Sequence, residues 1–185
     1  EYNKSLQEYR EQLSSGNVEL NSLQNQLDSV KKEKESLETR LSQVSGADGN
    51  NKLLTAVIKA ANLYISNDST GAAEAIADVD VSSLPVEEAK TLYNTISGAT
   101  MMNAANDLYN RGMTAYNKAD YTTAADLLVR AYKCDKTKAD AVFYAAKSYV
   151  ALNQPDNAKK YYQIIADEFK SSGYVTEAQA YVQSH

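Results

Sequence analysis

The side chains best suited to chemistry are few and far apart. The only histidine, His185, is the last residue, and the only cysteine, Cys134, lies near the end of a predicted helix. Without a second histidine, this sequence cannot form a Ser-His-Asp triad or a Cys-His pair of the usual kind. A lone helical cysteine is more often a small packing residue than a nucleophile. We therefore predict no catalytic residues and no enzymatic activity.

Three short polar stretches contain the residue types of metal or phosphate sites. "DGNN" at 48–51 lacks the spaced acidic ligands and the terminal glutamate of a calcium loop. In "NDSTG", Asp68 or Ser69 is expected to cap the N-terminus of a helix. The two carboxylates of "DVD", Asp78 and Asp80, are expected to face solvent. These stretches predict helix ends, so we expect no metal and no cofactor.

The composition favours helices and a protein partner. The chain has 185 residues, with only seven glycines and two prolines, which disfavours a fold of strands and turns. It carries 19 basic and 24 acidic residues, for a net charge of −5. No long basic stretch is present, so nucleic acid is not expected as a partner. No apolar run approaches the roughly 20 residues of a membrane span.

The leucines of the first 45 residues follow a heptad pattern. With residue 6 at position a, every leucine of this segment falls on position a or d. Such a seam over about six heptads predicts a coiled coil. Gly16 and Lys34 weaken the seam, and the number and direction of the strands stay open. Nothing else in the chain is expected to cover the seam, so we predict a homo-oligomer through Leu6, Leu13, Leu20, Leu23, Leu27, Leu37 and Leu41.

A second pattern repeats every 34 residues. Gly112 steps to Ala146, and Ala124 steps to Ala158. In both copies, one amphipathic helix is followed by a short turn and a second helix. Small residues at these positions let two helices approach closely. A degenerate copy, "YISNDSTGAAEAI", lies 52 residues upstream of "YNKADYTTAADLL". The extra segment at 83–97 supplies another helix, which runs on toward 99–118 or breaks at a glycine.

Helix pairs with a 34-residue period resemble the tetratricopeptide repeat (TPR) family. The family's tryptophan is replaced by Leu108 and Val142, and its proline between repeats by Lys136. The resemblance implies an all-α solenoid that ends in a capping helix at 174–182. We divide the chain into a coiled coil (1–45), a linker (46–51) and a TPR-like domain (52–185).

The resemblance also implies a peptide-binding groove lined by the first helix of each pair, the A helix. The groove positions of the degenerate unit would be Val57, Ile58, Ala61 and Tyr64. For Tyr109, Tyr116 and Phe143, packing between neighbouring A helices is the favoured explanation, whereas the amides and the lysine are expected to be exposed. The candidate peptide-binding residues are Tyr109, Asn110, Met113, Tyr116, Asn117, Phe143, Tyr144 and Lys147.

A coiled coil followed by TPR units is similar to an arrangement found in bacterial envelope proteins, often behind a membrane anchor. This likeness implies a non-enzymatic scaffold outside the cytoplasmic membrane, with an anchor upstream of Glu1 and protein partners of unknown identity. The alternative is a structural spacer or assembly subunit that binds no peptide. The likeness favours an extracytoplasmic, membrane-tethered location over a cytoplasmic one.

Overall fold

The computed structural model describes the backbone of residues 2–43 and 48–185, and the side chains of residues 5, 7, 8, 10–39 and 52–185. The described residues form helices and no β-strand, which confirms the all-α class. The elements are α1 (Tyr2–Gln43), α2 (Asp48–Ile65), α3 (Ser69–Ile76), the 3₁₀ turn η1 (Val81–Ser83), α4 (Glu87–Asn117), α5 (Tyr121–Cys134), α6 (Ala139–Ala151), α7 (Pro155–Glu168) and α8 (Val175–Ser184).

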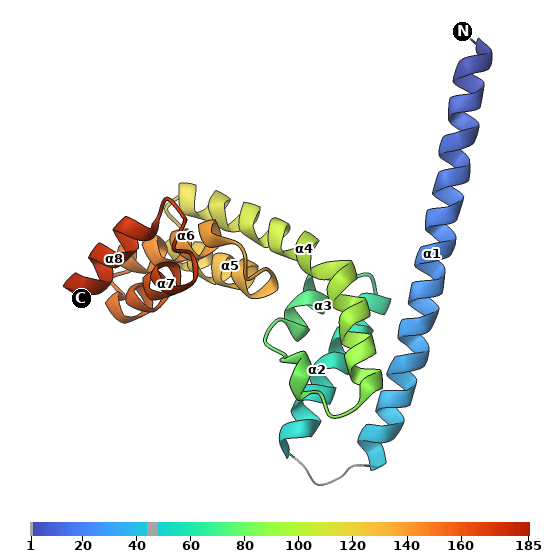
Figure 1. Cartoon of the computed structure of the whole chain (residues 1–185), viewed down its shortest axis with the longest axis horizontal. Coiled ribbons are helices and arrows are strands. Elements are labelled where there is room, and N and C mark those ends of the chain that lie inside the picture. Colours follow the sequence, from blue (N-terminus) through green and yellow to red (C-terminus); the bar gives the residue numbers. More distant parts are fainter. Residues whose placement is uncertain (1, 44–47) are drawn as a thin grey trace.

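Helix α4 belongs to two helical bundles (Figure 1). Its N-terminal half packs with α2, α3 and the C-terminal half of α1 in the first bundle. Its C-terminal half packs with α5 and α6 in the second bundle, which α7 and α8 complete. Met101 contacts both cores. The helix continues through Gly98, so of the two alternatives from the sequence, the uninterrupted helix is correct.

The helix pairs of the second bundle follow the 34-residue repeat. The pairs are the C-terminal half of α4 with α5, and α6 with α7, followed by α8. At the crossing of α4 and α5, a Cβ atom added to Gly112 would lie 2.8 Å from Cγ of Leu128. Ala124 and Ala158 are fully buried. Small residues therefore bring the paired helices together, as the sequence predicted.

The turn inside each helix pair has the same backbone geometry. Asn67, Ala119 and Asn153 have φ values of 64°, 58° and 54°, in the left-handed region. In each turn, the next residue's N–H bonds to the carbonyl five residues earlier, as in Asp120 to Ala115 at 3.0 Å. This is the Schellman pattern of a helix C-terminus. The spacings between the three left-handed residues, 52 and 34, are those of the sequence repeat.

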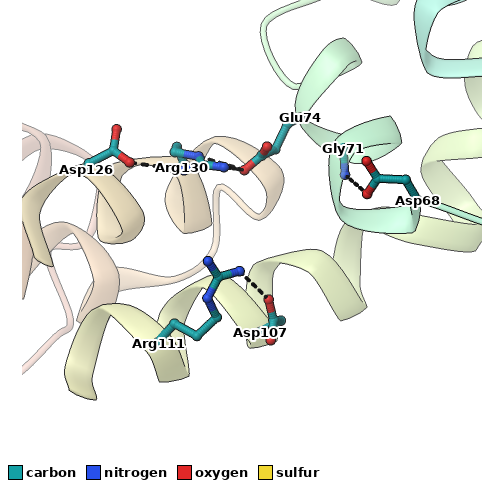
Figure 2. Close-up of polar contacts among 7 residues, drawn as sticks. All are labelled: Asp68, Gly71, Glu74, Asp107, Arg111, Asp126 and Arg130. Atoms are coloured by element: carbon teal, nitrogen blue, oxygen red, sulfur yellow. Dashed lines mark hydrogen bonds and ion pairs between the residues drawn. The ribbon is translucent and has the colours of Figure 1, made fainter. Parts of the chain in front are cut away.

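Aspartates begin the second helix after two of these turns. The Asp68 carboxylate accepts a hydrogen bond from Gly71 N at 2.8 Å, which confirms its predicted capping role (Figure 2). Asp120 accepts a bond from Thr123 N at 3.2 Å at the start of α5. These bonds satisfy backbone donors that have no partner within the helix, so they fix where α3 and α5 begin.

Ion pairs join the two bundles alongside α4. Arg130 of α5 reaches Glu74 of α3, with 2.6 Å between Nε and Oε1 (Figure 2). Its Nη1 atom also lies 3.0 Å from a carboxylate oxygen of Asp126. Close by, Lys133 pairs with Asp78 at 2.6 Å. The second helix of one pair is thereby connected to the second helix of the preceding pair.

Helix α1 is covered by its own chain over its C-terminal half. Val30 and Leu37 are fully buried in the first core, against α2 and α4. The expectation that nothing else in the chain covers the leucine seam is therefore wrong for this half. The reason is that α2 runs back along α1 and presents its own apolar residues to the seam (Figure 1). The N-terminal half of α1 extends beyond the bundle.

The segment predicted as a linker is partly helical. Helix α1 ends at Gln43, and α2 begins at Asp48. Residues 48–51 of the predicted linker therefore belong to α2, although they include a glycine and two asparagines. Residues 46–47 of that linker lie outside the described residues. Tertiary packing of α2 outweighs the low helix propensity of its first turn.

Candidate interaction surfaces

Aromatic residues of α4 and α6 meet on one side of the second bundle. The rings of Tyr116 and Tyr144 are 5.1 Å apart, in an edge-to-face arrangement. Tyr109 lies two helical turns before Tyr116 on α4 and is also half-buried. We call the surface formed by Tyr109, Tyr116, Tyr144 and Lys147 the A-helix face. The structure thus brings together four of the predicted peptide-binding residues.

Lys147 was predicted to be exposed, but in the structure it is half-buried and contacts its neighbours within this face. Its Nζ atom lies 3.5 Å from a carboxylate oxygen of Glu177 on α8. The same atom lies 5.3 Å from the centroid of the Phe143 ring. A lysine between a carboxylate and an aromatic ring has fewer accessible rotamers than a solvated one. Its charge is therefore positioned at the boundary between α6 and α8.

Phe143 supports the face from within. Its side chain is 5% exposed and stacks on Tyr174, with ring centroids 4.1 Å apart. For Phe143, packing between helices therefore explains the residue, and a ligand cannot reach it directly. Met113 is half-buried against the same core. The amides Asn110 and Asn117 are exposed, as predicted.

Tyr174 and Glu177, near the C-terminal end of the chain, complete the face. Neither residue was predicted from the sequence to be part of it. The Tyr174 hydroxyl hydrogen bonds to the Asp140 carboxylate at the start of α6. Glu177 pairs with Lys147. A further 34-residue step from Asp140 and Phe143 leads to Tyr174 and Glu177, so α8 stands where a third A helix would begin. The signal was present, but this helix was interpreted only as a cap.

Three tyrosines at the face, Tyr109, Tyr116 and Tyr174, keep their protons at neutral pH. Burial raises the pKa of Tyr174 to about 12, and its hydrogen bond to Asp140 adds to the effect. Burial also raises the pKa values of Tyr109 and Tyr116, despite the opposing charge of Lys147 near Tyr116. These phenols are therefore neutral and retain their hydrogen-bond donors. A face of this kind can offer a peptide flat aromatic area together with polar groups.

The A-helix face ends near Tyr109 and does not continue into the degenerate unit. Beside Tyr109, Lys138 lies 5.6 Å from the ring centroid and donates a hydrogen bond to Asn106 at 2.8 Å. In the degenerate unit, the predicted groove residues Val57, Ile58 and Ala61 are buried in the first core, and Tyr64 is half-buried. The three buried residues cannot line a peptide-binding groove, because α1 and α4 pack against α2.

The leucine seam of α1 is divided between two environments. Leu13, Leu20 and Leu23 are 68%, 64% and 57% exposed, Leu27 is half-buried and Leu37 is completely buried. The side chains of Leu6 and Leu41 lie outside the described residues. Three of the predicted oligomerisation residues are therefore open to a partner, and Leu37 is not.

The chemically reactive side chains have structural roles. Burial raises the pKa of the Cys134 thiol to about 11, so it is protonated at neutral pH. His185 stacks on Tyr181, with ring centroids 4.1 Å apart. Asp78 is exposed as predicted, although it pairs with Lys133, and the Asp80 carboxylate accepts bonds from the residues of η1. Among the described residues, no cluster of histidine, cysteine or acidic side chains is arranged to hold a metal ion.

None of the described helices is both long and apolar enough to cross a membrane. Comparisons of the chain with family models, with curated proteins and with solved structures gave no match.

Proposed function

We propose that the chain is a non-enzymatic scaffold that binds a segment of a partner protein on the A-helix face and assembles through α1. The observation that carries the proposal is the convergence of Tyr109, Tyr116, Tyr144 and Lys147 from two A helices. Aromatic side chains beside a positioned charge are the usual anchors of protein interfaces. The TPR resemblance supports the same surface, because the A helices bind peptides in that family.

Self-association is the second part of this proposal. Leu13, Leu20 and Leu23 lie on one seam of a helix and are more than half exposed. Covering one leucine contributes about 1.5–3 kcal/mol. Six such side chains from two copies therefore offer roughly 9–18 kcal/mol, against an estimated cost of association of about 4–15 kcal/mol. The midpoints of the two ranges favour assembly.

Peptide display tests the first part. A library of random peptides is selected on the whole chain, and the enriched peptides are measured by fluorescence polarisation. The triple variant Asn110→Ala/Asn117→Ala/Lys147→Ala should weaken their binding by at least about tenfold, because it removes polar groups of and beside the A-helix face. The matched control changes exposed residues of α5 and α7, the second helices of the two pairs: Thr122→Ala/Lys160→Ala/Gln163→Ala should bind as the wild type does.

Circular dichroism should show that both variants fold. If the selection enriches no peptide, or if the enriched peptides bind equally well to the A-helix variant, the A-helix face is not the binding surface. In that case the spacer function, in which the helices only set distances between assembled parts, would explain the chain better.

A further inference from the structure

The leucine seam of α1 changes its environment near Leu27. Beyond this point, Val30 and Leu37 face α2 and α4 and are fully buried. Before it, Leu20 and Leu23 lie on the same a/d seam, Leu23 at the same heptad position as Val30 and Leu37, but both leucines are exposed. The seam therefore continues past the end of the bundle with the same chemistry and no cover from the described part of the chain. Whatever covers it lies in line with the first bundle.

A groove marks the place where the bundle ends and the exposed seam begins. It has a volume of about 450 Å³. Leu23 and Leu27 form its wall on α1, and Tyr64 and Ile65 form its wall on α2. The groove is open at this end of the bundle, so a helix lying along the exposed seam would place one of its ends here. Gln26, Asn67 and Ser69 also line the groove, so it offers both apolar and polar contacts to the end of such a helix.

We propose that a second copy of this chain covers the exposed seam, with its α1 running antiparallel to the first. This inference rests on the self-association that the proposed function includes, and it specifies the direction of the strands. In a parallel, in-register pair, the partner's residues 27–37 would face Val30 and Leu37. The space beside those residues is already filled by α2 and α4. A parallel pair would therefore have to splay or displace the first bundle.

The antiparallel arrangement avoids this overlap. Each α1 pairs over its N-terminal half, and the partner's first turns reach the groove beside Leu23 and Leu27. The partner's bundle then lies beyond the opposite end of the paired segment. Each seam is covered along its length, first by the partner and then by its own α2 and α4. The direction follows from the position of the bundle on α1.

Charges select the register of the pair. In one antiparallel register, Leu13 lies opposite the partner's Gly16, Gln12 faces the partner's Glu19, and Asn17 faces the partner's Arg10. No like charges meet along these flanks. A shift by one heptad in one direction places Glu19 opposite the partner's Glu19, and a shift by one heptad in the other direction places Arg10 opposite the partner's Arg10. Like charges across a helical interface are destabilising, so the first register is favoured.

Sedimentation velocity over a dilution series tests whether the seam is the interface. Leu20→Glu should shift the full chain from dimer to monomer and raise the dissociation constant by at least about tenfold. Val18→Glu is the matched control: Val18 is 67% exposed on the same helix but lies at heptad position f, away from the seam. This control should remain dimeric. A wild-type chain that is monomeric at all concentrations would overturn both this inference and the self-association in the proposed function.

Cross-linking tests the direction of the strands. In a Cys134→Ala background, Leu20→Cys should not form a disulfide-linked dimer, because the two Leu20 positions lie about 16 Å apart along the helix axis in the antiparallel register. A mixture of Gln12→Cys and Glu19→Cys chains should be joined by a short bismaleimide into a heterodimer. Glu19→Cys chains alone should be joined far less, because the two Glu19 positions lie about 14 Å apart along the helix axis in this register.

The parallel arrangement reverses the first result. In that geometry, two cysteines at position 20 would face each other, and Leu20→Cys would oxidise readily to a covalent dimer. This outcome, in a chain that sediments as a dimer, would overturn the antiparallel inference and leave the proposed self-association standing. A failure of Gln12→Cys and Glu19→Cys chains to cross-link in the dimeric mixture would also overturn it.

Discussion

One residue in each helix pair has a left-handed backbone, and its identity varies. Two of the three positions, Asn67 and Asn153, hold asparagine, which tolerates this conformation better than most residues. The third, Ala119, has a φ of 58° although its Cβ atom disfavours positive φ. The turn is imposed on Ala119 by the helices on either side and by the capping carboxylate of Asp120.

Replacing this alanine should therefore stabilise the protein. Ala119→Gly should raise the free energy of unfolding by about 0.5–1 kcal/mol, because glycine adopts positive φ without strain. Ala99→Gly is the control: Ala99 is exposed within α4, where glycine should cost about 0.5–1 kcal/mol. Urea denaturation at unchanged m-value measures both. Equal shifts of the two variants would show that Ala119 carries no strain.

The two glycines of α4 should respond in opposite ways to the same substitution. At Gly112, a Cβ atom would lie 2.8 Å from Leu128 Cγ and 3.3 Å from Leu127 Cβ. Gly112→Ala should therefore cost about 1–3 kcal/mol through overpacking of the helix crossing. At Gly98, a Cβ atom would meet no atom within 4 Å. Gly98→Ala should stabilise the helix by about 1 kcal/mol. Thermal unfolding gives both signs, and a neutral Gly112→Ala would contradict the close crossing.

Among the helices, α1 combines two roles that separate along its length. Leu37 is completely buried, so Leu37→Ala should cost about 2–5 kcal/mol of folding stability at any protein concentration. Leu23 is 57% exposed, so Leu23→Ala should leave the stability of the monomer nearly unchanged and weaken self-association. Denaturation at several protein concentrations distinguishes the two effects. A concentration-dependent loss for Leu37→Ala would place that residue in the interface between copies.

The division of α1 also shows what the sequence could predict. A heptad pattern predicts that the apolar a/d face of a helix is buried. It does not predict whether helices of the same chain or of another chain bury it. Leu23 and Leu37 occupy the same heptad position and differ only in what lies beside them. The 34-residue period was more informative, since it predicted the helix pairs, the small residues at their crossings and most of the A-helix face. It failed at Val57 and Ile58, because the inserted helix segment and α1 enclose the degenerate unit.

At the scale of the whole molecule, the two bundles should unfold together. They share the uninterrupted helix α4, the side chain of Met101 and the ion pair between Arg130 and Glu74. Calorimetry of the wild type should therefore show one cooperative transition. Gly98→Pro should split it into two, because proline breaks the helix between the bundles at a cost of about 3 kcal/mol or more. Two transitions in the wild type would contradict this coupling.

The continuity of α4 also makes the molecule a lever. Its 31 residues form an arm of about 46 Å, at 1.5 Å per residue. The N-terminal half of α4 packs beside α1, and the C-terminal half of α4 carries part of the A-helix face. A rotation of about 5° about the N-terminus of α4 displaces its C-terminus by about 4 Å, which is of the order of one helical pitch. A force that rotates α1 therefore also moves the second bundle, and over a larger distance. In the same way, a force on the second bundle exerts a torque on the leucine seam of α1.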